Sequence, residues 1–488
     1  MKMSEVIAGL PIEMQSADDP EVTGISQNSL FVQEGYLFVA LVGKRFDGRA
    51  FIPDAVERGA IAVMASGPPP PGYKGVWLTA DDPRWLIGPL AGRIYDHPDD
   101  HMLMVGVTGT NGKSTVAFLM VSSLEAAGLP TGTIGTLGHQ FAGEVFNADR
   151  TTPEASNMYR LLARMRESGA KAVCAEVSSQ GLALGRVEGL RFDLGVFTNL
   201  TRDHFDFHRD FEDYYASKRR LFEQLKPDGK AVINLDDPYG RRLAEELSAV
   251  YTYGAEGDVS CSEADFTARG IKGVLVTPRG ELRFESPLLG TYNLVNIVAA
   301  AAAAEALGID HEAIAAGIAA QAPLTGRLEP IECGQTFPVL IDYAHTDAAL
   351  EATLKAIRAF LPHKILLVFG CGGDRDPGKR HLMGRVAGEL ADMAVITTDN
   401  PRGEDPLAIV AAVEQGIKES GNSSYRILPD RREAIRRAIA QADEDWVVLV
   451  AGKGHEEFQI VGDKRSYFSD HREVKLALEE RLGQRANQ

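Results

Sequence analysis

Cysteine and long apolar runs are both scarce in this 488-residue chain. Its four cysteines show no CxxC spacing, which argues against a disulfide framework and against a zinc site, so we expect reduced thiols. The longest apolar run, residues 297–304, is mostly alanine and far too short to span a bilayer. Residues 1–10 lack the basic flank and apolar stretch of a signal peptide. We therefore expect a cytoplasmic protein, monomeric and without a membrane segment.

Positively charged residues are outnumbered by negatively charged ones. The chain has 51 Lys and Arg, 68 Asp and Glu, and a formal net charge of −17. Because nucleic-acid binding relies on clustered Lys and Arg, no nucleic-acid partner is expected. Any anionic substrate must instead meet a local basic site. The hydrophobic fraction of 44% is ordinary for globular proteins, and the length predicts roughly three domains of ~100–200 residues each.

Apolar patterning divides the chain into three α/β segments. Residues 1–100 read as a small α/β domain, with strands predicted at 36–42 and 61–64, a helix at 52–58 and a proline-rich break at 67–72. Residues 101–328 begin with a strand, a glycine-rich turn and a helix at 116–127, and further strands are predicted at 172–177, 194–198 and 231–234.

Residues 329–488 repeat the strand and helix alternation, after a junction near residues 326–329. Helices are predicted at 347–360 and 378–390, and strands at 339–343, 365–369, 394–398 and 446–451. Such alternation indicates parallel sheets. The predicted fold is therefore α/β with three domains: a small N-terminal α/β domain, a central P-loop ATPase sheet and a C-terminal doubly wound, Rossmann-like sheet. Ligands of such sheets bind beyond the carboxyl ends of the strands, where polar clusters recur in this sequence.

The strongest local signal is residues 104–115, MVGVTGTNGKST, in which a strand runs into glycines and then into Lys113 and a hydroxyl residue that open a helix. Backbone N–H groups in such a loop can cradle phosphates, with Lys113 reaching the terminal phosphates and Ser114 binding Mg²⁺. The strict GxxxxGK spacing fails because position 107 is Val. The alternative, a glycine-rich turn with an incidental lysine, is disfavoured by the strand and helix context. The predicted ATP-binding residues are Gly109, Thr110, Asn111, Gly112, Lys113, Ser114 and Thr115.

Two further clusters follow predicted strands. Glu176 and His204 are plausible Mg²⁺ ligands, with Lys218 on a helix predicted at 211–226, although each alone could be a helix cap or a hydrogen-bond partner. The last segment gathers loop residues suited to carboxylate or phosphate recognition, unless they are simply solvated charges. These residues are Arg375, Arg380, Asn400, Arg402, Lys453 and His455.

Taken together, these motifs resemble the Mur ligase family of peptidoglycan synthesis. The resemblance rests on GVTGTNGKST at 106–115, TNLTRDH at 198–204, GRLE at 326–329, DYAH at 342–345 and FGCGGDRD at 369–376. It implies an enzyme whose three domains bind a UDP-sugar, ATP and an amino acid, and which activates a carboxylate as an acyl phosphate. Within the family, DNPR at 399–402 followed by GKGHE at 452–456 resembles the members that add meso-2,6-diaminopimelate to UDP-N-acetylmuramoyl-L-alanyl-D-glutamate.

The resemblance also implies roles for individual residues. Lys113, Glu176, His204 and Lys218 would be catalytic, with Ser114, Glu176, His204 and Lys218, as a carbamate, holding Mg²⁺. ATP would also meet Asn293, Arg327 and Asp342, and the UDP-muramoyl substrate would meet Ser29, Thr151, Thr152, Ser178 and Arg186. Arg402 would face the distal carboxylate of diaminopimelate and Glu456 its distal ammonium, in a site completed by Arg375, Asp399, Asn400, Pro401 and Gly452.

Five positions depart from the family pattern, and three other functions remain open. The departures are Asn28 and Leu30 around Ser29, Gln180, Leu184 and Asp347. A lysine-adding ligase would share the reaction, but lysine lacks the carboxylate that Arg402 would bind. A folylpolyglutamate synthase is disfavoured by the domain that precedes the phosphate loop. A non-catalytic, nucleotide-dependent binding module is disfavoured by the intact set of catalytic residues.

Overall fold

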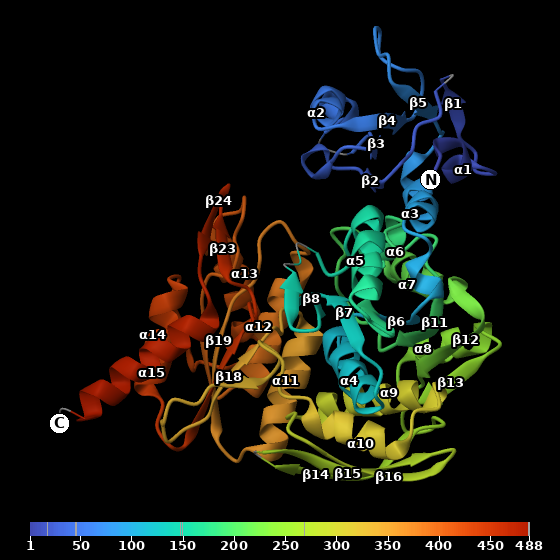
Figure 1. The fold of residues 1–488 in the computed structure, drawn as a ribbon. Coiled ribbons are helices and arrows are strands. Elements are labelled where there is room, and N and C mark those ends of the chain that lie inside the picture. Colours follow the sequence, from blue (N-terminus) through green and yellow to red (C-terminus); the bar gives the residue numbers. More distant parts are fainter. Residues whose placement is uncertain (17, 44–45, 147, 149, 268, 487–488) are drawn as a thin grey trace.

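Three large sheets follow one another along the chain in the computed structural model, which describes residues 1–16, 18–43, 46–146, 148, 150–267 and 269–486 (Figure 1). Each sheet is mainly parallel and is covered by helices, so the predicted α/β class is confirmed. The boundaries predicted at 100/101 and 328/329 stay predictions.

The N-terminal sheet has the order β1-β5-β4-β3-β2 and is parallel except for β1. Its strands are β1 (Glu13–Gln15), β2 (Gly24–Ser26), β3 (Tyr36–Val39), β4 (Ala60–Ala65) and β5 (Val76–Thr79), with helices α1 (Met3–Ile7), α2 (Ile52–Glu57) and α3 (Ile87–Ile94). The strand predicted to reach residue 42 ends at Val39. On α3, a Cβ at Gly88 would lie 1.8 Å from the Glu188 carbonyl oxygen, so glycine lets this helix approach the central domain closely.

The central sheet has the order β13-β12-β11-β6-β10-β7-β8-β9, parallel from β13 to β7. Its strands are β6 (Leu103–Thr108), β7 (Thr131–Gly135), β8 (Gly138–Phe141), β9 (Glu144–Phe146), β10 (Ala172–Glu176), β11 (Phe192–Phe197), β12 (Leu225–Asn234) and β13 (Val250–Tyr253). Val107 pairs with Glu176, and Thr108 with Phe197, so the carboxyl ends of three strands meet at one edge. This edge carries the phosphate loop.

Helices cover both faces of the central sheet. Buried apolar residues of α4 (Lys113–Ala126), α9 (Thr291–Ala306) and α10 (His311–Ala320) form one core, and those of α5 (Ala155–Glu167), α7 (Phe211–Glu223) and α8 (Pro238–Glu246) belong to the other; α6 (Ser179–Ala183) follows β10. The helix predicted at 211–226 ends at Glu223, because Leu225 already pairs with Phe192 in the sheet. The prediction was wrong over its last three residues.

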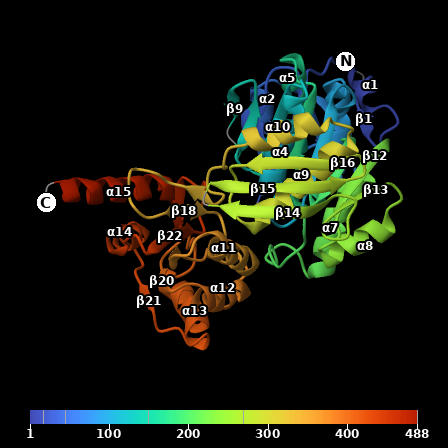
Figure 2. The ribbon, with the colours of Figure 1, turned by 90° about the horizontal axis from the view of Figure 1, so that it is seen from below.

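A small antiparallel sheet that the sequence patterning did not indicate packs against α10 and α9 (Figure 2). It comprises β14 (Ser260–Thr267), β15 (Gly270–Thr277) and β16 (Gly280–Ser286). The alanine-rich run 297–304 lies within α9 and is buried along its whole length. Within the described ranges, no helix is both long and apolar enough to cross a membrane. The four cysteines are free, as their spacing predicted.

The C-terminal sheet has the order β17-β18-β22-β19-β20-β21 and is parallel except for β17. Its strands are β17 (Glu329–Pro330), β18 (Val339–Asp342), β19 (Lys364–Phe369), β20 (Met393–Ile396), β21 (Tyr425–Ile427) and β22 (Trp446–Ala451). One face packs on α11 (Asp347–Phe360), α12 (Gly378–Leu390) and α13 (Pro406–Glu419), and the other on α14 (Arg431–Gln441) and α15 (Asp470–Ala486). Helices on both faces confirm the doubly wound prediction, and a hairpin of β23 (Phe458–Val461) and β24 (Lys464–Tyr467) follows β22.

Candidate active site

The phosphate-binding loop lies between β6 and α4, and two of its glycines are required by close packing. A Cβ at Gly109 would lie 1.8 Å from Thr198 Oγ1, and one at Gly112 would lie 2.4 Å from Asn296 Oδ1. Both glycines have positive φ, of +150° and +85°, which other residues rarely adopt. The loop therefore brings its backbone against neighbouring segments in a shape that favours glycine at these two positions.

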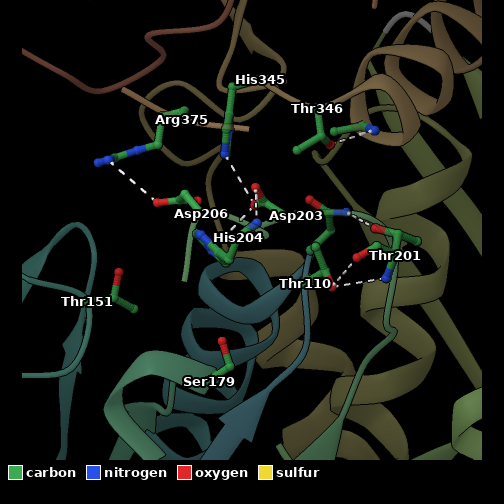
Figure 3. Close-up of polar contacts among 12 residues, drawn as sticks. Thr110, Thr151, Ser179, Thr201, Asp203, His204, Asp206, His345, Thr346 and Arg375 are labelled. Carbon is green, nitrogen blue, oxygen red and sulfur yellow. Dashed lines mark hydrogen bonds and ion pairs between the residues drawn. The ribbon is translucent and has the colours of Figure 1, made fainter. Parts of the chain in front are cut away.

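The segment after β11 braces this loop through hydrogen bonds. Thr198 Oγ1 donates to the Asn111 carbonyl at 2.6 Å, and the Asn111 N–H donates to Asn199 Oδ1 at 2.9 Å. The Thr201 N–H donates to Thr110 Oγ1 at 3.0 Å (Figure 3). The loop is consequently held in shape before any phosphate arrives, which is the condition for preorganised charge stabilisation.

Two side chains at the start of α4 have the chemistry of a triphosphate site. The Lys113 ammonium donates to the carbonyls of Gly109 and Thr110, both at 2.9 Å, so it lies over the mouth of the loop. Ser114 Oγ is buried and has no hydrogen-bond partner within the described part of the chain. A buried hydroxyl without a partner is uncommon, and it fits a hydroxyl that ligates a metal ion.

Lys218 lies buried on α7, with its Nζ 4.5 Å from the centre of the Tyr214 ring. Burial, and then the positive charge of Lys113, hold the pKa of Lys218 well below its usual range. Burial likewise lowers the pKa of Lys113, although the Glu176 carboxylate opposes this shift. A lowered pKa favours the neutral, nucleophilic form of a lysine amine.

Glu176 and His204 both stand at the sheet edge beside the loop. Glu176 accepts hydrogen bonds from the Thr136 N–H at 2.9 Å and from Thr136 Oγ1 at 3.0 Å. His204 has a left-handed backbone, with φ of 57°, an unusual conformation that is often found at functional sites. Burial lowers its pKa to about 4, against the opposing effect of Asp203, so the imidazole is neutral at physiological pH.

The loop that carries His204 joins the central and C-terminal domains (Figure 3). Asp203 Oδ2 lies 3.5 Å from His345 Nε2, Arg202 Nε donates to Asp376 at 2.9 Å, and Arg375 lies 3.8 Å from Asp206. Although burial alone would raise it, the pKa of Asp203 is held well below its usual range by His204, His345 and Lys379. The two domains therefore meet at the predicted metal-binding segment.

A cavity of about 1180 Å³ opens between these two domains. This exceeds the usual volume of a small-molecule pocket, about 300–1,000 Å³, and suits more than one substrate. The predicted site residues that line it are Thr151, Ser178, Arg186, His204, Arg375 and Glu456. Residues predicted to bind the UDP-muramoyl substrate, the metal ion and diaminopimelate thus line the same cavity.

The residues predicted for the UDP-muramoyl substrate fall into two places. Thr152 Oγ1 donates to the Glu176 carbonyl at 2.9 Å and lies 3.0 Å from Ser178 Oγ. Arg186 pairs with Glu154 at 3.2 Å, and Thr151 lies 3.0 Å from Thr136 through its hydroxyl. Ser29 lies apart in the N-terminal domain, where its hydroxyl donates to Asp54 at 3.1 Å.

The remaining residues predicted for ATP surround the junction between the domains. Asn293, buried near the start of α9, accepts a hydrogen bond from Asn296 at 3.1 Å. Asp342 accepts hydrogen bonds from the backbone N–H groups of Leu328 at 2.7 Å and Ala344 at 2.9 Å. The Arg327 guanidinium lies 4.8 Å from the centre of the Tyr343 ring, and its buried Nε has no partner in the described residues.

The C-terminal loops assemble a smaller cluster than the sequence indicated. Asn400 donates to Glu456 at 2.8 Å, and Arg402 donates to the Gly373 carbonyl at 2.7 Å. Asp399, Pro401 and Gly452 complete this loop edge, where a Cβ at Gly452 would lie 2.8 Å from Asp399 Oδ2.

Two members of the predicted cluster are already paired within the protein. The Arg380 guanidinium forms two hydrogen bonds to Glu404, at 2.7 and 2.8 Å. The buried Lys453 ammonium pairs with Glu456 at 3.2 Å. Each of these two charges thus already has an acidic partner, and the predicted recognition of carboxylate or phosphate by Arg380 and Lys453 stays a prediction.

Thr136, Tyr214 and Asn296 belong to the site but were not predicted. Thr136 follows β7 at the same sheet edge as Glu176, and Asn296 packs against the phosphate loop. Tyr214 lies 3.0 Å from Thr110 through its hydroxyl. The position of Thr136 after a strand was a usable signal, whereas the two helical residues carried none.

Comparison with known proteins assigns a family to each part of the chain. Residues 107–304 match the Mur ligase middle domain, residues 326–454 match the Mur ligase glutamate ligase domain, and residues 21–72 match the Mur ligase family catalytic domain. A protein of Geobacter metallireducens called UDP-N-acetylmuramoyl-L-alanyl-D-glutamate–2,6-diaminopimelate ligase is 43% identical, with 94% of both chains covered. A protein of the same name from Gloeobacter violaceus is 42% identical over 99% of both chains.

Solved structures agree with this assignment. A structure of a ligase of that same name has a TM-score of 0.69 at 32% identity and covers 99% of both chains. The MurF ligase from Thermotoga maritima in complex with ADP has a TM-score of 0.69 at 18% identity, covering 95% of this chain and 99% of its own. The second likeness is one of fold alone.

Proposed function

The chain belongs to the Mur ligase family, and from this premise we propose that it is an ATP-dependent ligase that joins meso-2,6-diaminopimelate to UDP-N-acetylmuramoyl-L-alanyl-D-glutamate. The observation that carries the proposal is the shared cavity, which is lined by Thr151, Ser178 and His204 of the central domain and by Arg375 and Glu456 of the C-terminal domain. We further propose a cytoplasmic monomer whose N-terminal domain, with Ser29, binds part of the UDP-sugar.

The chemistry follows from the reactivity of a carboxylate, which is a poor electrophile with a poor leaving group. Transfer of the γ-phosphoryl group from ATP to the D-glutamyl side-chain carboxylate gives an acyl phosphate and ADP. The diaminopimelate amine then attacks the carbonyl carbon, the C–N bond forms, the C–O bond to phosphate breaks, and the nitrogen loses a proton. Lys113 is placed to stabilise the negative charge on the transferring phosphoryl group.

Mg²⁺ is proposed to be held by Ser114, Glu176, His204 and Lys218 as a carbamate. The described residues contain no cluster of three or more His, Cys, Asp or Glu that could hold a metal by themselves. The Ser114 hydroxyl, which has no partner among the described residues, fits an ion that also takes ligands from water and substrate phosphates, as Mg²⁺ does. When bound, Mg²⁺ would neutralise phosphate charge.

Replacing Ser114 with alanine tests the proposed metal contact. We expect the Mg²⁺ concentration for half-maximal activity to rise about tenfold or more, because ligand-shell losses typically cost 10–100-fold in metal affinity or activity. The measurement is initial rate against Mg²⁺ at saturating ATP. The S123A variant is the matched control, because Ser123 lies on the same helix with its hydroxyl bonded to the Leu119 carbonyl. An unchanged Mg²⁺ requirement in S114A would remove Ser114 from the site.

The choice of diaminopimelate over lysine rests on Arg402. Its guanidinium is anchored to the Gly373 carbonyl, and burial lowers its pKa. Lysine has no distal carboxylate, so it would leave this half-buried cation unpaired, at a cost of about 1–3 kcal/mol or more. Asn400 and Glu456, hydrogen-bonded to each other, are placed to meet the distal ammonium.

Replacing Arg402 with methionine should therefore lower discrimination rather than abolish ligation. We expect kcat/KM for diaminopimelate to fall about 10- to 100-fold, in line with the loss of one charged hydrogen bond, while kcat/KM for lysine changes little. Both amines are compared in one phosphate-release assay. Arg426, an exposed residue on β21, gives the matched control R426M. An equal loss for both amines would show that Arg402 does not select the side chain.

The proposal as a whole is tested by phosphate release from ATP in the presence of UDP-N-acetylmuramoyl-L-alanyl-D-glutamate and either diaminopimelate or L-lysine. Turnover with diaminopimelate alone is the expected result. Preference for lysine would keep the ligase and overturn the pocket argument. ATP binding without turnover in either mixture would favour the non-catalytic binding module.

A further inference from the structure

His455 lines the cavity, and its imidazole has an unusual environment. Within the described residues neither ring nitrogen has a hydrogen bond or ion pair, and Nδ1 is completely buried. Its ring contact is with the Tyr343 ring, at 4.9 Å between centroids. Nε2 is not among the fully buried atoms, so it is the ring nitrogen that a ligand in the cavity can reach.

The backbone around His455 is tightly fixed, so the position of the ring is built into the fold. A Cβ at Gly454 would lie 2.7 Å from Tyr343 Cβ, and one at Gly326 would lie 2.4 Å from the backbone nitrogen of His455. The Glu456 N–H closes a turn onto the Lys453 carbonyl at 2.9 Å. His455 is thus held in a fixed position at the junction between the domains, on the same loop as Glu456.

Burial and the groups around the ring keep it neutral. Burial, and then the neighbouring Arg327, His345 and Lys453, lower the pKa of His455 to about 3. A neutral imidazole offers one unprotonated nitrogen as a hydrogen-bond acceptor. An acceptor nitrogen suits an N–H donor and does not suit a carboxylate. A carboxylate in this cavity would instead meet Arg375, which also lines it.

We propose that the unprotonated ring nitrogen of His455 accepts a hydrogen bond from the attacking amine of diaminopimelate and so orients that nitrogen toward the acyl phosphate. The inference rests on the proposed function and adds a residue to it. His204 and His455 line one cavity, so an amine held by His455 lies in the same space as the metal-binding edge. Holding a nucleophile in an attack geometry accelerates the step without changing how the carboxylate is activated.

The test separates orientation of the amine from activation of the carboxylate. In H455F the ring can still stack on Tyr343 but the acceptor is lost, and we expect kcat for ligation to fall about 10- to 100-fold, the usual loss for a misplaced reactant. KM for diaminopimelate should change less than about threefold, because a group that orients the reacting nitrogen acts mainly on kcat. Hydroxylamine is then supplied in place of diaminopimelate. The hydroxamate formed with ATP and the UDP-muramoyl substrate should match wild type, since the acyl phosphate still forms.

Two further variants distinguish this role from a structural one. Free imidazole should restore part of the ligation rate to H455G, and H101F, a change at an exposed histidine, should behave as wild type. Unchanged kcat in H455F, a rise in KM alone, or an equal loss of hydroxamate would overturn the inference. If the wild-type protein forms hydroxamate but does not ligate diaminopimelate, the proposed amino-acid substrate is wrong instead.

Discussion

Replacing Lys113 with alanine is expected to lower ligation by at least about 10³-fold, the scale on which phosphoryl-transfer enzymes depend on a single cation. The ammonium lies over the phosphate loop, bonded to the carbonyls of Gly109 and Thr110. When a triphosphate enters, these carbonyls can be exchanged for phosphate oxygens that bind the cation more strongly. Without Lys113 the loop keeps its backbone N–H donors but loses the positive charge that stabilises the γ-phosphoryl group during its transfer. The measurement is product formation and phosphate release with both co-substrates.

Loss of fold is a separate explanation for an inactive variant, and it can be measured. The loop is braced mainly by Thr198, Asn199 and Thr201, none of which bonds to the lysine side chain, so the thermal midpoint of K113A should stay close to wild type. Lys171 is an exposed lysine that precedes β10, and K171A should remain fully active. Near-normal product formation by K113A would contradict the phosphate-loop assignment.

Replacing Lys218 with alanine is expected to cost at least about 10²-fold in activity, comparable to the loss of other metal-supporting groups. The amine is completely buried, and burial and Lys113 lower its pKa, which favours the unprotonated form that reacts with CO₂ to give a carbamate and a proton. This reaction replaces a basic group with an anion that can bind Mg²⁺. A buried cation there would instead repel both Lys113 and the metal ion.

Short carboxylic acids provide the discriminating measurement for Lys218. K218A leaves a space beside Tyr214 into which formate or acetate can bring the missing carboxylate, and partial recovery of activity is expected. K218M fills the same space with an apolar chain, so added acid should not restore it, which makes it the matched control. Failure of every short acid to restore K218A would count against the carbamate.

Most of the site scaffold was accessible from sequence because it depends on local order. A strand, a glycine-rich turn with a lysine and a helix together predict a phosphate loop, and α11, α12 and β22 begin and end at the predicted residues. The parallel register then brings the ends of β6, β10 and β11 together without further information. The clustering of Glu176 with the phosphate loop follows from these facts.

Contacts between distant segments were not accessible in the same way. Arg380 and Glu404 are separated by a whole strand, so their pairing depends on how α12 and the loop after β20 fold together. In the small sheet, β16 alternates buried and exposed residues from Leu282 to Ser286, a usable signal that the sequence patterning missed, whereas β14 is mostly exposed. The sheet packs its buried residues against the apolar face of α10. Nothing in the sequence around His455 indicated that its ring would lack a partner.

The ion pairs that join the central and C-terminal domains bear on how often the enzyme can turn over. Arg375 and Asp206 are partly exposed, as are Arg202 and His345, and pairs of this kind contribute only about 0–1 kcal/mol each and weaken with salt. Ion pairs of this strength let the two domains close and open at little cost in free energy. Substrates that bind in the cavity between the two domains are therefore expected to add to these weak contacts, so that the closed arrangement depends on which substrates are bound.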